Sequence, residues 1–239
     1  MKNFLLTLAS VLLLGVGYAQ NPTDNAAVKG PQSEWLQTFV RLEIEGPMDV
    51  VLVPVGADQA PKIIYDTKGA YTSKFRYQVK DRVLRLSERN DPRRPERTTV
   101  TVYYTPMKEL FVCDAAVVCQ EVVLTDLLDL TLTGNASFTG ELDVKDLKMI
   151  ASGHSTAQLS GLARYLTLSA VSAKVDAADL ETMSAIAEAK SSAQVRLNVS
   201  ERIEARTSMK GSISFKGKPS IVRGEGVRFM GGDIVGLEN

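Results

Sequence analysis

The chain has 239 residues, of which 44% are hydrophobic and 23% are charged, and its 28 acidic side chains balance its 28 basic ones. This composition is typical of a globular protein and excludes a largely disordered chain. Because the charges balance, it also excludes the overall basic field that would hold nucleic acid or an anionic membrane surface.

The first 19 residues predict a secretory signal peptide. Lys2 gives a positive start, residues 4–16 are mostly apolar, and Gly17 and Ala19 are small residues before a cleavage point. We expect export to the periplasm, the outer-membrane surface or the extracellular space. The alternative is an uncleaved anchor, although the apolar run is short for a bilayer span. No later segment reaches about 18 apolar residues, so we expect no transmembrane segment in the mature chain.

Residues 20–37 are polar and contain glycine and proline, which predicts a linker. We expect Trp35, as its apolar anchor, to dock on the end of the domain that follows. Residues 38–106 predict a series of irregular strands, because apolar and polar residues alternate in segments such as Val40 to Glu45 and Phe75 to Lys80. A loop at 87–97 carries four arginines, and its own acidic residues favour a solvated loop over an anion-binding site.

Residues 107–223 contain repeats with a period near 19. Two rows of apolar residues define them, and each member of the second row comes two residues after a small residue. The first row is Leu110, Leu127, Leu147, Leu166, Met183, Ile203 and Ile221, and the second is Phe138, Leu159, Val175, Val195 and Ile213. A fixed period of this length is typical of a solenoid.

We therefore predict an all-β protein, a single-stranded right-handed parallel β-helix with the strands of 38–106 as its N-terminal cap. The head domain would cover 38–223, and 224–239 would be a C-terminal tail. Residues 179–190 are rich in alanine and glutamate, which would also suit a helix. Small or apolar residues (Met183, Ala185, Ala187 and Ala189) nevertheless alternate with Ser184, Glu188 and Lys190, which predicts a narrow coil of strand.

Cys113 and Cys119 are the only cysteines, and export permits a disulfide between them. The alternative, two buried free thiols, is about equally consistent with the sequence. The single histidine, His154, lies in a predicted turn, and two thiols without a nearby histidine do not complete a zinc site. We expect no cofactor and no metal, and we find no catalytic cluster: no acidic residues are expected to stack in adjacent coils beside a matching basic residue.

Several phrases, in this order, resemble one known family. They are Phe39-Val-Arg-Leu-Glu-Ile-Glu-Gly46, Val50-Val-Leu-Val-Pro-Val55, Val83-Leu-Arg-Leu86, Thr99-Val-Thr-Val-Tyr-Tyr-Thr-Pro106 and Ile213-Ser-Phe-Lys-Gly-Lys-Pro219. Together they are similar to the auto-transporter adhesin head domain family of the Bacteroidetes (DUF2807, the head GIN domain). The resemblance implies a β-helical cell-envelope protein and supplies no catalytic residues.

The hypothesis that follows is a non-enzymatic, adhesin-like module that binds a glycan or an envelope or host protein through an outward strand face. One alternative is a polysaccharide lyase or glycosidase, which would need paired carboxylates in a groove. Another is a structural or regulatory envelope protein without a ligand of its own. The sequence does not determine the oligomeric state.

Overall fold

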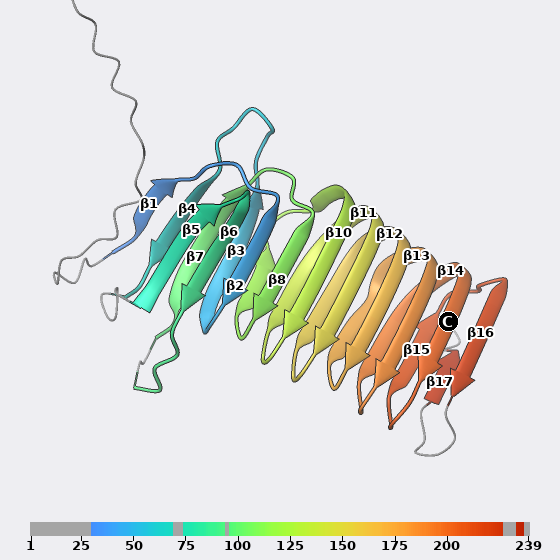
Figure 1. Cartoon of the computed structure of the whole chain (residues 1–239). Coiled ribbons are helices and arrows are strands. Elements are labelled where there is room, and N and C mark those ends of the chain that lie inside the picture. The colour runs from blue at the N-terminus through green and yellow to red at the C-terminus, as the bar shows by residue number, and fades with distance from the viewer. Residues whose placement is uncertain (1–29, 69–73, 94–95, 227–232, 237–239) are drawn as a thin grey trace, which may run out of the picture.

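A computed structural model describes residues 30–68, 74–93, 96–226 and 233–236. The expected signal peptide lies outside the described residues. Within them the protein is a β-solenoid of about six turns without an α-helix (Figure 1). None of the described segments forms a helix that is long and apolar enough to cross a membrane.

The regular coils begin with β8 (Glu109–Cys113), and every strand from there onward pairs in parallel with strands of the coils beside it. They comprise β9 (Ala116–Cys119), β10 (Val123–Thr133), β11 (Ser137–Ser152), β12 (Thr156–Val171), β13 (Lys174–Lys190), β14 (Gln194–Thr207), β15 (Ser212–Lys216), β16 (Ile221–Gly226) and β17 (Asp233–Gly236).

Each long strand bends and contributes to two sides of the solenoid. The first residues of β11 pair with β9, whereas its later residues pair with β10. We call the side that contains β8, β10 and the later halves of β11 to β14 the first face. The side that contains β9, β15 and the earlier halves of β11 to β14 is the second face.

Apolar side chains that alternate along the strands fill the interior, and the observed rows differ from the predicted ones. The first row runs through Leu128, Leu147, Leu166, Ala185 and Ile203, with spacings of 19, 19, 19 and 18. The predicted members Leu110, Leu127, Met183 and Ile221 were therefore wrong. Leu110 pairs with Leu130 and belongs to the next inward row. Leu127 is 40% exposed and Ile221 is 42% exposed, because each lies one residue away from the inward position.

The second row shows one further correction. Phe138 pairs with Ala157 and then, in turn, with Val175, Val195 and Ile213. The predicted member Leu159 instead pairs with Gly140 and is buried in the next inward position.

The alanine-rich coil is a strand, as predicted. β13 runs without a break and pairs in parallel with both neighbours, and Ala185, Ala187 and Ala189 are buried. A register shift between Ala177 and Glu181 accommodates extra residues of β13 as a bulge, and a second shift between Thr182 and Ser184 accommodates one extra residue of β14.

The N-terminal strands extend the solenoid in an order that differs from the chain order. β2 (Arg41–Glu45) lies between β6 (Val83–Glu88) and β8, and β3 (Met48–Pro54) lies between β7 (Thr98–Tyr104) and β9. All four of these pairings are parallel, so β2 and β3 form interior rungs although they come early in the chain.

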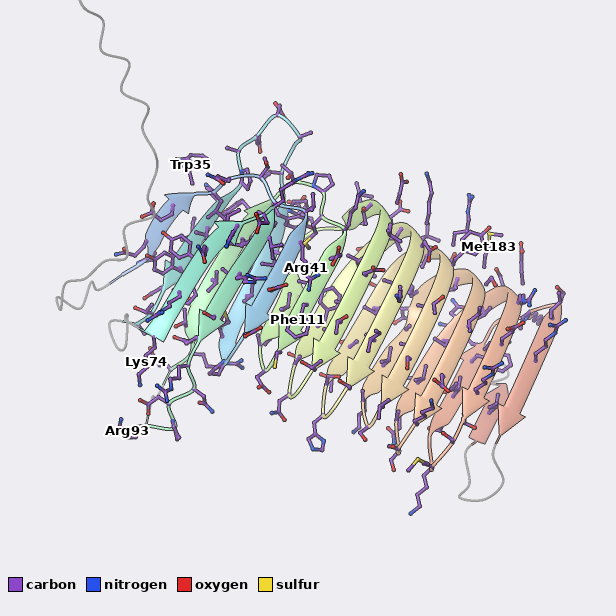
Figure 2. All side chains as sticks on the ribbon, in the orientation of Figure 1. Trp35, Arg41, Lys74, Arg93, Phe111 and Met183 are labelled. Atoms are coloured by element: carbon purple, nitrogen blue, oxygen red, sulfur yellow. The ribbon has the colours of Figure 1, made fainter. Side chains whose placement is uncertain are left out.

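Antiparallel strands then cover this end. β5 (Phe75–Lys80) pairs with β6, β4 (Lys62–Asp66) pairs with β7, and β1 (Gln32–Trp35) pairs with β4. Strand β1 falls within the segment expected to be a linker. Its Trp35 is 73% exposed and projects from the edge of the sheet (Figure 2), so the expectation that it docks on the domain was wrong.

At the other end, part of the expected tail belongs to the last coil. β16 extends to Gly226 and β17 pairs with β15. Val222 occupies an inward position of the first row but is 54% exposed, because only one side of β16 is covered by a neighbouring coil.

Candidate functional site

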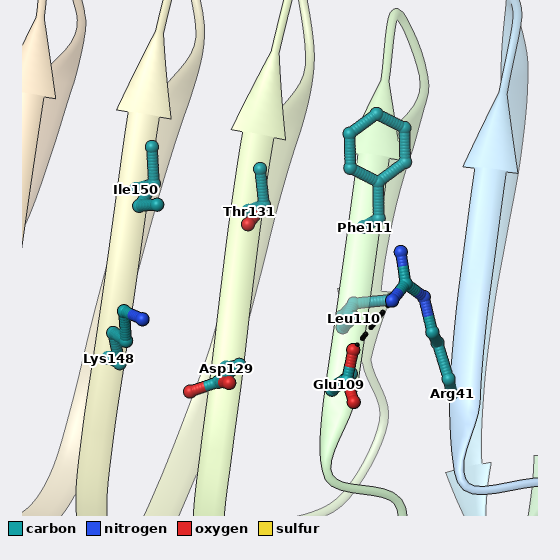
Figure 3. Close-up of a pocket in the computed structure, with 8 residues that line it drawn as sticks. All are labelled: Arg41, Glu109, Leu110, Phe111, Asp129, Thr131, Lys148 and Ile150. Atoms are coloured by element: carbon teal, nitrogen blue, oxygen red, sulfur yellow. Dashed lines mark hydrogen bonds and ion pairs between the residues drawn. The ribbon is translucent and has the colours of Figure 1, made fainter.

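A shallow hollow of about 180 Å³ lies on the first face where the N-terminal rungs meet the regular coils (Figure 3). Strands β2, β8, β10 and β11 lie side by side here, and the hollow is lined by residues of all four. They are Arg41, Glu109, Leu110, Phe111, Asp129, Thr131, Lys148 and Ile150.

Strand register places these side chains in two rows. The charged row follows the pairing of Arg41 with Glu109, of Glu109 with Asp129, and of Asp129 with Lys148. Two residues further along each of the last three strands, Phe111, Thr131 and Ile150 form the second row. The short threonine between two bulky side chains leaves the space that forms the hollow (Figure 3).

The charged groups at the N-terminal edge of the hollow are paired. Arg41 Nη1 donates to Glu109 Oε2 at 2.8 Å, and Arg41 Nε lies 2.8 Å from Glu43 Oε1. Arg85 Nε donates to the other Glu43 oxygen at 2.5 Å. These contacts fix the guanidinium of Arg41 against the sheet.

Asp129 and Lys148 differ from those groups. Neither side chain has an ion-pair or hydrogen-bond partner in the part of the chain that the structure describes, although they occupy adjacent strands in register. A carboxylate, an ammonium and the Thr131 hydroxyl are therefore available beside the apolar side chains of Phe111 and Ile150. Apolar walls with a few polar groups are typical of ligand sites.

This arrangement corrects one prediction from the sequence. We expected no acidic residues stacked in adjacent coils beside a basic partner, but Glu109 and Asp129 stack in this way between Arg41 and Lys148. The spacings of Glu109, Asp129 and Lys148 match the repeat period and could have revealed their stacking. Arg41 carries no such signal, because it is 68 residues from Glu109 and their pairing depends on the unusual strand order.

The hollow has few features of a hydrolytic site. A glycosidase places two carboxyl groups on either side of a scissile bond, whereas the Glu109 carboxylate is engaged by Arg41 and both acidic residues belong to one row on a single wall. The described residues include no group of three or more side chains able to hold a metal ion.

Other residues singled out from the sequence lie outside this hollow. His154 is exposed at a corner of the solenoid. The two cysteines, whose disulfide stays a prediction, are free thiols in the structure. The thiol of Cys119 packs within reach of Gly140, and burial raises its pKa to about 12, which disfavours the nucleophilic thiolate form.

The arginine-rich loop at 87–97 is held by ion pairs where it is described. Lys74 Nζ lies 2.6 Å from Asp91, which Arg93 also contacts, and the Lys74 ammonium holds the pKa of that carboxyl well below its usual range. Arg97 Nη1 lies 3.1 Å from Asp49 Oδ1, and Arg97 Nη2 donates to the backbone carbonyls of Met48 in β3 and of Asp114 in the turn between β8 and β9. These contacts attach the loop to the solenoid.

Comparisons with known proteins agree with this architecture. The chain is similar to crystal structures of a putative adhesin from Bacteroides fragilis (19% identity, TM-score 0.76, covering 88% of this chain and 99% of that one) and of another from Parabacteroides distasonis (16%, TM-score 0.68, 87% and 96%). A third, named a putative lipid binding protein, is also from Parabacteroides distasonis (16%, TM-score 0.64, 87% and 97%). At these identities the similarity shows the fold alone.

No curated protein matches the chain significantly. The family model described as "Putative auto-transporter adhesin, head GIN domain" (DUF2807) matches residues 38–219, a range that includes β2 to β15 and every residue of the hollow. The chain therefore belongs to the DUF2807 family.

Proposed function

We propose that the protein is a non-catalytic, adhesin-like envelope module that binds a glycan in the hollow of the first face. The observation that carries the proposal is the pairing of apolar walls with polar groups that have no partner in the described chain: Phe111 and Ile150 enclose Thr131, and Asp129 and Lys148 lie beside them. The family name and the expected signal peptide support a location at the cell surface.

A sugar ring suits this chemistry. One face of a ring is apolar and packs on an aromatic side chain such as Phe111, while its hydroxyls donate to Asp129 and accept from Lys148. A volume of about 180 Å³ suits a single ring of a longer chain. A protein partner would need a contact area near 800 Å² on each side, far more than the hollow supplies.

The test is a glycan array probed with the mature protein, together with a variant that fills the hollow. Thr131→Arg places a long side chain between Phe111 and Ile150 and should abolish glycan binding. Ser169→Arg is the matched control, because Ser169 occupies the same outward row two coils from Thr131, outside the hollow. Glycan binding that survives Thr131→Arg, or that Ser169→Arg abolishes equally, would contradict the proposal.

Catalysis is the second candidate, since Glu109 and Asp129 do stack. Release of reducing ends from any polysaccharide bound on the array, lost in Asp129→Asn, would favour a glycosidase over a binding module. Because one similar structure is named a lipid binding protein, anionic and neutral phospholipid vesicles form a further arm, and vesicle binding lost in Thr131→Arg would assign the hollow to lipid instead.

A further inference from the structure

A second and larger cavity, of about 570 Å³, lies where strands of the second face end. We call it the corner pocket. The ends of β3 and β7 form one wall, and the connection from β9 into β10 forms the other together with Glu141 of β11. Its volume falls in the range of about 300–1,000 Å³ that is typical of small-molecule sites. It shares no lining residue with the hollow of the first face.

Tyr104 provides a polar group in the wall of the corner pocket. The side chain is 2% exposed, and its hydroxyl has no hydrogen-bond partner among the described residues. Most buried polar groups in proteins are paired, and an unpaired one costs free energy. Burial also raises the pKa of Tyr104, so the group is a neutral hydroxyl that donates and accepts. A ligand atom in the pocket would satisfy it.

The remaining lining combines apolar surface with negative charge. Pro106, Val122 and Leu124 supply the apolar part, and Leu124 is 63% exposed although it is a large hydrophobic residue. Glu121 and Glu141 supply two carboxylates, and neither has an ion-pair partner in the described part of the chain. Two unpaired carboxylates beside an apolar surface favour a cation with an apolar body.

We propose that the corner pocket binds a small aliphatic amine. The ammonium group lies between Glu121 and Glu141 and donates to the hydroxyl oxygen of Tyr104, and the carbon chain packs on Val122 and Leu124. The pocket is larger than a single lysine side chain requires, which favours a free amine over a lysine of a partner protein. This site is separate from the glycan-binding hollow and does not depend on it.

The test is isothermal titration of the mature protein with n-octylammonium, n-octanoate and n-octanol, which share a chain length and differ in charge. Octylammonium should bind, and octanoate should bind at least tenfold more weakly. The double variant Glu121→Gln/Glu141→Gln should weaken octylammonium binding at least fivefold and leave octanol unchanged. Glu181→Gln is the matched control, because Glu181 is an exposed carboxylate without a partner in the described chain and lies two coils away from Glu141.

Tyr104→Phe removes the hydroxyl and keeps the aromatic ring, so it tests the hydroxyl alone. It should weaken octylammonium binding several-fold while the thermal midpoint of the free protein stays the same or rises, because a buried unpaired hydroxyl is removed. Equal binding of octanoate, octylammonium binding unaffected by the double variant, or the absence of octylammonium binding at millimolar concentration would each overturn the proposal. A fall in the thermal midpoint of Tyr104→Phe with unchanged amine affinity would show that a water, and not a ligand, pairs with the hydroxyl.

Discussion

Single residues at the solenoid corners determine whether the chain turns at the right place. Asp114 adopts a left-handed backbone conformation (φ 59°) between β8 and β9, and its carboxylate accepts hydrogen bonds from the backbone and side-chain nitrogens of Asn135 in the next coil at 2.8 and 3.0 Å. Glycines 134 and 153 occupy the corresponding left-handed positions of the following coils. A stack of such corners connects each coil to the next.

Replacement of Asp114 should therefore show two separable effects. Asp114→Ala loses the hydrogen bonds to Asn135 and places a residue with little tolerance for positive φ in the turn, so we expect a loss of about 2 kcal/mol in the free energy of unfolding. Asp114→Asn keeps an acceptor oxygen and tolerates this conformation, and should cost less than about 1 kcal/mol. Urea denaturation followed by circular dichroism measures both, and equal losses would contradict this account of the corner.

The pH dependence of the same pair gives an independent check. The backbone N–H of Asn135 is the main cause that lowers the pKa of Asp114 in the folded protein, so the charged form stabilises the fold. This stability is present above the unfolded pKa of about 3.9 and is lost as the pH falls through the lower, folded pKa. The difference in stability between the wild type and Asp114→Asn should shrink below pH of about 4.

At the scale of strands, the sequence was sufficient for the repeat but not for its exact register. The period near 19 and the alternation of apolar residues predicted parallel coils, and the alanine-rich β13 was correctly assigned to a strand. Leu127 was misplaced because Leu128 follows it directly, and two adjacent leucines satisfy the same spacing although only one points inward. Alternation by itself does not choose between them.

Predicting the candidate site required the register of strands far apart in the chain. Phe111, Thr131 and Ile150 lie in adjacent coils, so the period places them roughly together. Arg41 joins them only because β2 inserts between β6 and β8. No local sequence signal predicts that insertion, because it depends on the pairing of β2 with β6 and β8, which come much later in the chain.

At Gly161 in β12, the conformation of the coil depends on the close approach of the neighbouring backbone of β11. Gly161 has φ +97°, and a Cβ atom at this position would lie 2.1 Å from the carbonyl oxygen of Leu142 on β11. Gly161→Ala should therefore force β11 and β12 apart locally and lower the free energy of unfolding by about 2–4 kcal/mol.

Gly30 provides the matched control for this substitution. It has a similar φ of +106°, but a Cβ atom there would meet nothing within 4 Å. Gly30→Ala carries the conformational cost alone and should be much milder. If the two alanine variants have the same stability in thermal unfolding, close approach to Leu142 is not what requires glycine at position 161.

For the whole molecule, position in the sheet should determine local stability, whereas position in the chain should not. In a solenoid each rung is stabilised mainly by its two neighbours. Strands β2 and β3 have a parallel neighbour on both sides although they come early in the sequence, and β5, β4 and β1 cover the rungs beyond them. At the other end β16 and β17 each pair with an earlier rung, and Val222 and Val235 remain about half exposed.

Hydrogen exchange measured by mass spectrometry on the native protein should follow this order. Amides of β11 to β13 should exchange most slowly, amides of β2 and β3 should be nearly as protected, and those of β16, β17 and β1 should exchange first. The comparison of β2 with β16 is decisive, because both are short strands close to one end of the described chain. If β2 exchanged as rapidly as β16, the insertion of β2 between β6 and β8 would be wrong, and with it the position of Arg41 at the edge of the hollow.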